Sequence, residues 1–430
     1  MKNLLLVSLL LLGTYLWAQP DFSLEVVPTR IEGLPPLHSF THGQWNGKWV
    51  LLGGQTTVDF HYNCQNTQAV VIDPATGEVW AAEIDHADPS FLEAEQLFAS
   101  FGPSFQDGPT LYLAGGYGYS SRAGAYLTFP YLCAIDLPGL IEAVIGETKP
   151  SLGQFFRQAY HPDMAVMEGS LLRIDGQFYL IDGYRLPGVY ESEQEDFQKE
   201  PLRLVRPFFV EQGEDGALSI EVRHGFTYGP DFETLLPTAA PQVFPDLGEG
   251  LTLFESQAEA GLSWLNVFDM GYSVQKRNTA ELPHYHSAVI ALYDEDSGDM
   301  HTLFLGGCRS FWCEQEASRL PFRVEQAECF TRSYHGEIEI STLPIDPYQA
   351  WGRSTHFLPA GSAPTYPNGV IRLGELPAGR HLIGYLFGGA SCPTPLLFRN
   401  GETPALASNQ LFAVYLVRED SPAGKLGLQE

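Results

Sequence analysis

A short apolar run that ends in two glycines recurs along the chain. It reads first as Lys48-Trp49-Val50-Leu51-Leu52-Gly53-Gly54 and then as Thr110-Leu111-Tyr112-Leu113-Ala114-Gly115-Gly116. Later copies end at Asp182-Gly183, Gly306-Gly307 and Gly388-Gly389. An apolar run of this length bounded by glycine is typical of a buried β-strand. Glycine at the end of a strand supplies a positive φ or lets two backbones approach closely.

The copies are regularly spaced. Gly54 and Gly389 are 335 residues apart, which is five intervals of 67. The long gap between Gly183 and Gly307 is filled by residues 251–256, where the glycines are replaced. A small-residue strand precedes the run, as at residues 38–41, 98–101 and 286–289, and a third and a fourth strand follow it. Six units of four short antiparallel strands predict an all-β fold, with each unit one blade of a β-propeller.

The unit resembles the kelch repeat, in which an apolar strand, a glycine pair, a third strand ending in Asp and a later Trp follow one another. The first unit has all of these, at Gly53, Gly54, Asp73 and Trp80. The resemblance covers roughly residues 21–420 and implies a six-bladed kelch-like β-propeller. The last unit stops at its third strand, so we expect the alternating N-terminal strand at residues 21–28 to close the last blade and cover its edge.

The composition limits the possible functions. Of the 430 residues, 44% are hydrophobic, which excludes disorder as the overall state. The 52 acidic and 24 basic residues give a formal net charge of -28. Such a surface repels phosphate groups, so we expect no nucleic-acid partner.

The first residues have the pattern of a signal peptide. A Lys near the start is followed by an apolar stretch too short to span a membrane, and Ala18 is a suitable cleavage site. We expect a signal peptide at residues 1–18, one propeller domain at 19–420 and a flexible tail at 421–430. The protein would then be secreted, or held in the periplasm or at the cell surface, with no transmembrane segment.

The connections between second and third strands are candidates for binding. Propeller geometry places them on one rim, where a rigid scaffold commonly carries its functional residues. Arg122, Arg185 and Arg309 follow glycine pairs, and Arg353 lies between two units. Converging guanidinium groups recognise carboxylates, so these arginines together with His286 form a candidate anion-binding site. The alternative is that each arginine pairs with a nearby acidic residue.

Six cysteines in an exported chain make disulfides possible. Cys64 and Cys392 lie in the first and last long connections, which meet where the ring closes, so we predict a bond between them. Cys308 and Cys313 are candidates for a second bond within one loop. The remaining two, Cys133 and Cys329, sit in apolar runs and are expected to be buried thiols.

Function remains open at this point. The first hypothesis is a monomeric, secreted binding module that presents its loop-rich rim to a protein or glycan, which is anionic if the arginines converge. The second is a carbohydrate-active enzyme resembling the kelch-type sialic-acid mutarotases (N-acetylneuraminate epimerases). A copper radical oxidase, another enzyme type built on kelch blades, is disfavoured, because Cys64 and Tyr62 have no matching set of further ligands. The sequence contains no motif for a metal or a cofactor, and catalytic residues cannot be assigned from it.

Overall fold

The computed structural model describes residues 20–57, 64–85, 94–148, 150–188, 200–202, 204–214, 216–227, 238–259, 262–269, 275–278, 287–306, 326–345, 354–391 and 406–419. The expected signal peptide at 1–18 and the tail at 421–430 lie outside these residues. Within them, no helix combines the length and the apolar character needed to cross a membrane.

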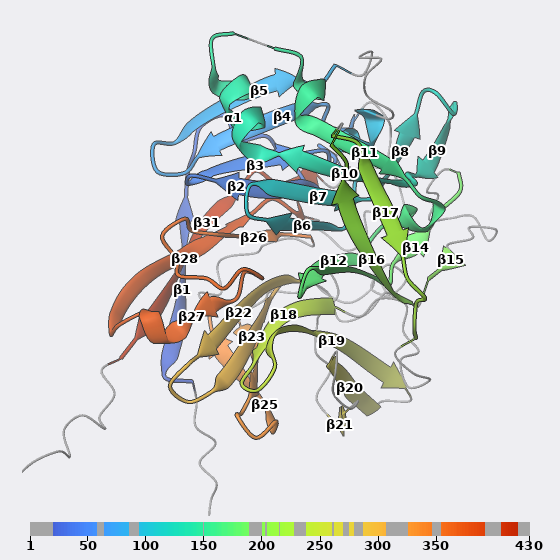
Figure 1. Ribbon diagram of the computed structural model, residues 1–430. Coiled ribbons are helices and arrows are strands. Elements are labelled where there is room, and N and C mark those ends of the chain that lie inside the picture. The colour runs from blue at the N-terminus through green and yellow to red at the C-terminus, as the bar shows by residue number, and fades with distance from the viewer. Residues whose placement is uncertain are drawn as a thin grey trace, which may run out of the picture.

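The described strands form a β-propeller (Figure 1). Its main sheets, numbered here in chain order, each contain four antiparallel strands. Sheet 1 consists of β2 (Thr41–Trp45), β3 (Lys48–Leu52), β4 (Gln68–Asp73) and β5 (Glu78–Glu83). Sheet 2 consists of β6 (Ser104–Asp107), β7 (Thr110–Ala114), β10 (Tyr131–Asp136) and β11 (Phe156–Tyr160). Sheet 3 consists of β12 (Ser170–Ile174), β13 (Gln177–Ile181), β16 (Val205–Gln212) and β17 (Leu218–Val222).

The second half of the chain repeats this arrangement. Sheet 4 consists of β18 (Thr238–Phe244), β19 (Gly248–Glu259), β20 (Leu262–Asp269) and β21 (Gln275–Asn278). Sheet 5 consists of β22 (Ala288–Asp294), β23 (Asp299–Leu305), β24 (Gln326–Arg332) and β25 (Ile338–Pro344), with β27 (Ile371–Arg372) added parallel to β22. Sheet 6 consists of β26 (His356–Pro359), β28 (Gly379–Phe387), β31 (Leu411–Arg418) and β1 (Phe22–Thr29).

Smaller elements lie in the connections. Three two-stranded sheets stand between second and third strands, namely β8 (Tyr117–Ser120) with β9 (Ala125–Thr128), β14 (Tyr184–Arg185) with β15 (Glu200–Pro201), and β29 (Ala390–Ser391) with β30 (Leu406–Ala407). The described helical segments are α1 (Leu137–Ile145) and the 3-10 turns η2 (Ala94–Phe98), η3 (Leu152–Phe155), η4 (Pro162–Met164) and η6 (Leu373–Glu375).

The hydrophobic core lies between the sheets. Separate clusters of buried side chains join sheet 1 to 2, 2 to 3, 3 to 4, 4 to 5 and 5 to 6. A further cluster, which contains Trp49 and Phe387, joins sheet 6 back to sheet 1. Each sheet thus buries both of its faces against its neighbours, which is the packing that stabilises a propeller.

The predicted closure by the N-terminal strand is confirmed. β1 pairs with β31 along its whole length, from Phe22 opposite Arg418 to Thr29 opposite Leu411. Phe22, Leu24 and Val26 are buried while the residues between them are exposed, as expected for a strand with one face on a core. The two ends of the chain therefore build one sheet together.

The glycine pair is explained by contact between neighbouring sheets. Gly115 has a φ of +60°, and a Cβ there would lie 2.1 Å from the carbonyl oxygen of Val166 in the segment leading to sheet 3. The next residue, Gly116, donates its N–H to that same oxygen at 2.8 Å. Gly53 meets the backbone of the following unit in the same way. The repeated motif therefore marks the points where one blade is bonded to the next.

Two details differ from the sequence-based expectation. The inner strand of sheet 2 starts at Ser104 rather than within residues 98–101, because Phe101 before it has a left-handed backbone. Helix α1 was not predicted. Its Pro138 occupies the first turn, and Leu137, Leu140, Ile141 and Val144 form a buried stripe at helical spacing.

The fourth unit, which lacks the glycine pair, has a different second strand. β19 continues straight past the position of the missing glycines, and its pairing with β20 extends to Glu259 opposite Leu262. Only residues 260 and 261 separate β19 from β20. Without glycines, no left-handed break leads the chain into a long loop.

Candidate ligand site in the central cavity

A cavity of about 300 Å³ lies where the inner strands begin, and all six main sheets contribute to its wall. The lining residues are Ser39, Phe40, Phe101, Gly102, Glu168, Gly169, Ser170, Thr238, Ala239, Ser287, Val289, Ser354, Thr355 and His356. Its volume is at the small end of the range for small-molecule sites. The first two strands of each sheet are antiparallel, so the inner strand begins at the end of the propeller where the second strand finishes. The long connections leave the second strands at that end, so the cavity lies on the predicted loop-bearing side.

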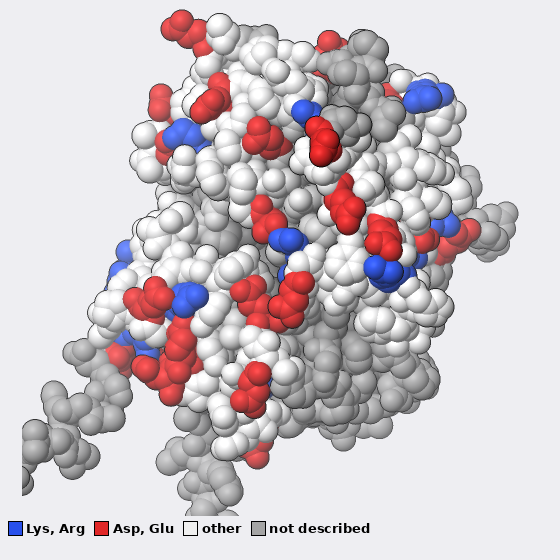
Figure 2. Space-filling view, viewed as in Figure 1, with Lys and Arg blue, Asp and Glu red and all other residues white. Residues whose placement is uncertain are grey.

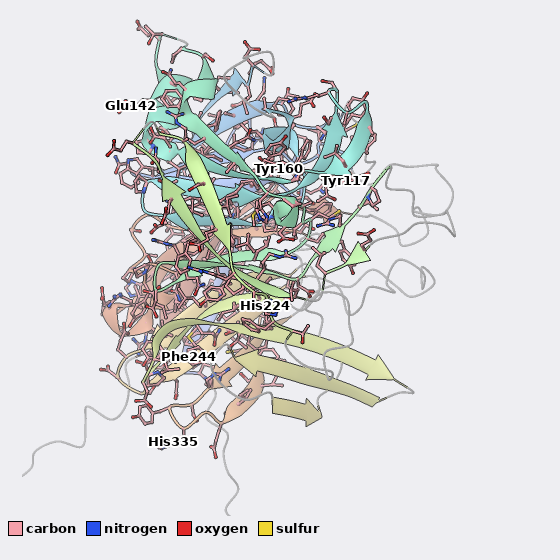
Figure 3. All side chains as sticks on the ribbon, turned by 45° about the vertical axis from the view of Figure 1, so that its right-hand side comes forward. Tyr117, Glu142, Tyr160, His224, Phe244 and His335 are labelled. Carbon is pink, nitrogen blue, oxygen red and sulfur yellow. The ribbon has the colours of Figure 1, made fainter. Side chains whose placement is uncertain are left out.

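Figure 3 shows the two ends of the propeller. Tyr117, the first residue of β8, lies on the right with the rim hairpins. Phe244, where inner strand β18 ends, and His335, in the turn after β24, lie on the left. The cavity is therefore at the Tyr117 end.

Four residues of the wall adopt a left-handed backbone although they are not glycine. They are Ser39, Phe101, Glu168 and Ser354, with φ between +55° and +59°. This conformation costs an L-residue about 1–2 kcal/mol. Each precedes the inner strand of its sheet by two or three residues, so the four occupy matching positions in sheets 1, 2, 3 and 6.

Backbone hydrogen bonds between sheets fix three of these residues. The N–H of Phe101 donates to the carbonyl oxygen of Ser39, and the N–H of Glu168 donates to that of Phe101, both at 2.9 Å. The positions are thus linked from sheet 1 to sheet 2 to sheet 3. A wall held by the scaffold in this way is preorganised for a ligand.

The chemistry of the wall is mainly that of hydroxyl groups. Six of the lining residues are Ser or Thr, two are Phe, one is Glu and one is His. No Lys or Arg occurs among the described lining residues. At least three of the six hydroxyls are already bonded within the protein, Ser39 with His38, Ser287 with Gly306 and Thr355 with Gly388, and their oxygen lone pairs can still accept from a ligand. The ring of Phe101 adds apolar surface. Such a wall suits a small ligand rich in hydroxyl groups.

A histidine pair stands beside the cavity, at the junction of sheets 6 and 1. His42 and His356 have ring centroids 5.3 Å apart, and Phe40 packs against His356 at 4.4 Å. Burial lowers the pKa of His42 to about 4. Burial, followed by the proximity of His42 and His38, lowers the pKa of His356 to about 3. Both rings are therefore neutral at physiological pH.

His38 has a structural role in holding Ser39. Its Nε2 lies 2.8 Å from the carbonyl oxygen of Thr57, and its Nδ1 lies 2.9 Å from the Ser39 hydroxyl. A carbonyl oxygen only accepts, so Nε2 donates to Thr57, which leaves Nδ1 for the bond with the Ser39 hydroxyl. His38 thereby orients a hydroxyl of the cavity wall.

The predicted arginines do not meet in the described part of the cavity. Arg122 is exposed on the turn between β8 and β9. Arg185 in β14 donates to the carbonyl oxygen of Pro162 at 3.1 Å. Both lie on connections between second and third strands, as expected, but neither lines the cavity. Arg309, Arg353 and His286 lie outside the described residues.

Other basic side chains mostly have acidic partners nearby, as Figure 2 illustrates for one face. Lys48 is 2.8 Å from Asp73, Arg418 is 3.0 Å from Asp21, and Arg173 pairs with Asp107. The bond from Lys48 holds the pKa of Asp73 below its usual value.

Two rim hairpins are joined to each other. Leu127 of β9 forms a bridge with Pro187, just after β14. The Tyr117 hydroxyl donates to the carbonyl oxygen of Gly188 at 2.8 Å, and the Leu186 N–H donates to the Thr128 hydroxyl at 2.9 Å. The rim over sheets 2 and 3 is therefore an ordered structure beside the cavity.

The cysteines give a partial answer. Cys64, Cys133 and Cys329 are free thiols. Cys133 and Cys329 are fully buried, as predicted, and burial raises the pKa of Cys329 to about 11. Cys308, Cys313 and Cys392 lie outside the described residues, so the pairings proposed for them stay predictions, although Cys64 is unbonded here.

Sequence reasoning missed Phe101, Glu168 and His42 as residues of this region. Phe101 and Glu168 share no residue type with Ser39, so no motif connects them. A signal does exist when the units are aligned on their glycine pairs. Ser39, Phe101 and Glu168 then fall at the same position before the inner strand. In the described residues, no group of three or more His, Cys, Asp or Glu is arranged to hold a metal.

Comparisons with known proteins add little. No family model matches the chain, and no curated protein does. Among solved structures, one titled "Structure of YjhT" aligns at 11% sequence identity and a TM-score of 0.45, covering 88% of this chain and 94% of that one. Similarity at this level carries no inference about activity, which therefore has to come from the site itself.

Proposed function

We propose that this protein is an exported, six-bladed kelch-type β-propeller that binds a carbohydrate in the cavity at the loop-bearing end of its central channel. The observation that carries the proposal is the hydroxyl-rich, aromatic-flanked wall to which all six main sheets contribute. The junction clusters, including the one between sheets 6 and 1, support the count of six blades. The glycine pairs, Asp73 and Trp80 support the kelch type.

The wall matches the surface of a sugar. A pyranose presents hydroxyl groups around its edge, each able to donate and accept, and C–H groups on its faces. Ser and Thr hydroxyl oxygens suit the former, and the partly exposed ring of Phe101 offers apolar surface to the latter. A protein ligand would instead need a far larger contact area than this cavity provides.

A binding experiment tests the proposal. Isothermal titration of the mature protein with a panel of mono- and disaccharides should give saturable binding. Phe101→Ala and Ser354→Ala should weaken binding about tenfold, because each removes one lining group. Phe226→Ala is the matched control, since Phe226 is an aromatic residue that is 41% exposed and absent from the cavity wall. If no sugar binds, or if the control weakens binding equally, the proposal is wrong.

The enzyme hypothesis has one specific observation in its favour. Glu168 and His356 both line the cavity, which brings a carboxyl group and a neutral imidazole to one site. In this hypothesis Glu168 moves the proton during ring opening and closure, while the imidazole of His356, whose pKa of about 3 makes it a poor base, donates a hydrogen bond. If the protein is an anomerase, NMR exchange between the anomers of a bound sugar will be faster than in buffer. Glu168→Gln and His356→Gln will return the rate to that of buffer while binding persists.

Export and domain limits belong to the same proposal. The apolar pattern of residues 1–18 supports cleavage after Ala18, and residues 19–420 would form one domain. The mass of the protein recovered from outside the cytoplasm should correspond to a chain beginning at Gln19. Recovery of the full-length chain from the cytoplasm would contradict this.

A further inference from the structure

The connection between the first two strands of sheet 6 differs from its counterparts in the other sheets. In sheets 1 to 5 these strands are joined by a tight turn, the longest of which is residues 295–298. In sheet 6, residues 360–378 separate β26 from β28. This connection, called here the floor segment, starts at the end of the channel opposite the rim, because β26 begins beside the cavity at His356 and runs away from it.

The floor segment enters the central channel. Its strand β27 pairs with the free edge of β22, the innermost strand of sheet 5, with Ile371 opposite Leu292 (Figure 1). Val289 of the same strand lines the cavity. At a rise of about 3.3 Å per residue, β27 therefore lies about 10 Å further along the channel than the cavity wall at Val289.

The floor segment also contacts sheets on other sides of the channel. A Cβ on Gly361 would lie 3.3 Å from Gly47, in the hairpin of sheet 1. The side chain of Asn368 donates to the carbonyl oxygen of Gln242 in sheet 4 at 2.9 Å. Val370 is completely buried in an apolar cluster that joins sheets 4 and 5. The segment thus reaches from sheet 1 to sheet 4 at this end of the channel.

A single acidic residue holds the floor segment on both sides of β27. The Tyr366 hydroxyl donates to Oε1 of Glu295 at 2.9 Å, and the Gly374 N–H donates to Oε2 of Glu295 at 3.1 Å. The guanidinium of Arg372 lies over the Tyr366 ring, 3.9 Å from its centroid. Ile371 between them is completely buried. These contacts make the segment a fixed part of the fold.

We propose that the floor segment closes the central channel at the end opposite the loop-bearing rim, so that the cavity is a blind pocket that accepts the terminal unit of a glycan and excludes an internal unit. This inference rests on the proposed carbohydrate-binding function. All six main sheets contribute to the wall of the cavity, so a sugar enters along the channel from the rim side. An internal unit would bring two continuing chains through that one mouth, and a cavity of about 300 Å³ leaves no room for them.

Cysteine labelling tests the closed floor without any sugar. Val289 and Ala291 lie on the same face of β22, but Val289 lines the cavity whereas Ala291 packs in one cluster with Val370. The thiol of Val289→Cys should react with iodoacetamide at least about tenfold faster than that of Ala291→Cys. Adding Asn368→Ala, which removes the bond from the floor segment to sheet 4, should accelerate labelling of Ala291→Cys and leave that of Val289→Cys unchanged. Equal rates in the two single variants would show that the channel is open at both ends.

Three trisaccharides test the ligand class. Each contains the monosaccharide that binds most tightly in the titrations, placed at the reducing end, at the non-reducing end or in the middle, and the other two units are the sugar that binds most weakly. One of the two terminal isomers should bind about as tightly as the monosaccharide, and the central isomer at least about tenfold more weakly. Binding of the central isomer as tightly as the better terminal isomer would overturn the inference.

Failure of the blind pocket and failure of the proposed function give different results. If the monosaccharide binds saturably but the central isomer binds as well as the terminal ones, the cavity binds sugar and the blind pocket is wrong. If no sugar of the panel binds while Ala291→Cys stays protected, the floor is closed, but the carbohydrate-binding function falls and the assigned ligand class falls with it.

Discussion

Single glycines set the spacing between neighbouring sheets. At Gly115 the second strand of sheet 2 ends against the backbone of the segment leading to sheet 3, leaving no room for a side chain. The same contact at Gly53 joins sheet 1 to the following unit. The Gly-Gly motif of the sequence is therefore required by close contact between neighbouring sheets. It does not indicate a flexible segment.

Gly115→Ala should lower the free energy of unfolding by about 3 kcal/mol or more, because the new Cβ would lie 2.1 Å from a backbone oxygen. Gly108→Ala is the control, since Gly108 has a φ of +55° with nothing within 4 Å of an added Cβ. The control should lose only the left-handed cost of about 1–2 kcal/mol. Urea unfolding measures both. Equal losses would mean that contact between the sheets is not what requires glycine.

The histidine pair should make the protein sensitive to acid. The unfolded chain protonates His42 and His356 near the ordinary pKa of about 6.5, whereas their pKa values in the folded protein are about 4 and about 3. The unfolded state thus binds more protons between these values. The contribution of the two neutral rings to the free energy of unfolding is complete above pH ~6.5. It is lost as the pH falls toward the pKa values of the folded protein.

Unfolding free energies measured from pH 7 down to pH 4 should therefore decrease, by about 2.5 kcal/mol per pH unit near pH 5 from these two rings. The double variant His42→Gln/His356→Gln should flatten the curve, while replacing the exposed His224 by Gln should leave it unchanged. A double variant with the same slope as the intact protein would show that other groups govern acid sensitivity.

At the scale of elements, β1 joins the two ends of the chain, because it pairs with β31 in sheet 6. This strand is the outer strand of sheet 6, and its buried side chains belong to the core between sheets 5 and 6. Without it, β31 would present an open edge to other molecules. The strand thus both closes the sheet and protects it.

Leu24→Ala should destabilise the protein by about 2–4 kcal/mol, because Leu24 is 5% exposed within that core. Val27→Ala, on the same strand but 39% exposed, should cost less than about 1 kcal/mol. Thermal unfolding and size-exclusion chromatography measure the effect, and Leu24→Ala should also promote association through the freed edge. Similar small losses from both substitutions would contradict the role of β1.

Strands were the predictable part of the fold, because apolar runs and glycine pairs are local signals. Helix α1 was missed because its apolar face packs in the core between sheets 1 and 2, and this tertiary contact cannot be seen in the sequence. The cavity was missed for a different reason. Ser39, Phe101 and Glu168 share a backbone conformation and a level in the ring, but not a residue type. The sequence analysis chose arginines as ligand-binding candidates because guanidinium groups bind carboxylates. In the structure Arg185 instead donates to the carbonyl oxygen of Pro162 and does not line the cavity.

At the scale of the whole molecule, closure of the ring creates the site. Residues from both ends of the chain and from its middle line one cavity, so no single unit contains the binding surface. The clusters on either side of sheet 6 hold this arrangement together. The function proposed here is therefore a property of the closed ring and is expected to be lost when the ring opens.

A crystal structure of the mature protein soaked with the monosaccharide that binds most tightly in the titrations would test this account most directly. We predict sugar density inside the cavity, in contact with Phe101. Density for the sugar only on the outer surface, or a cavity that stays empty at saturating sugar, would contradict the proposal that this channel mouth is a carbohydrate site.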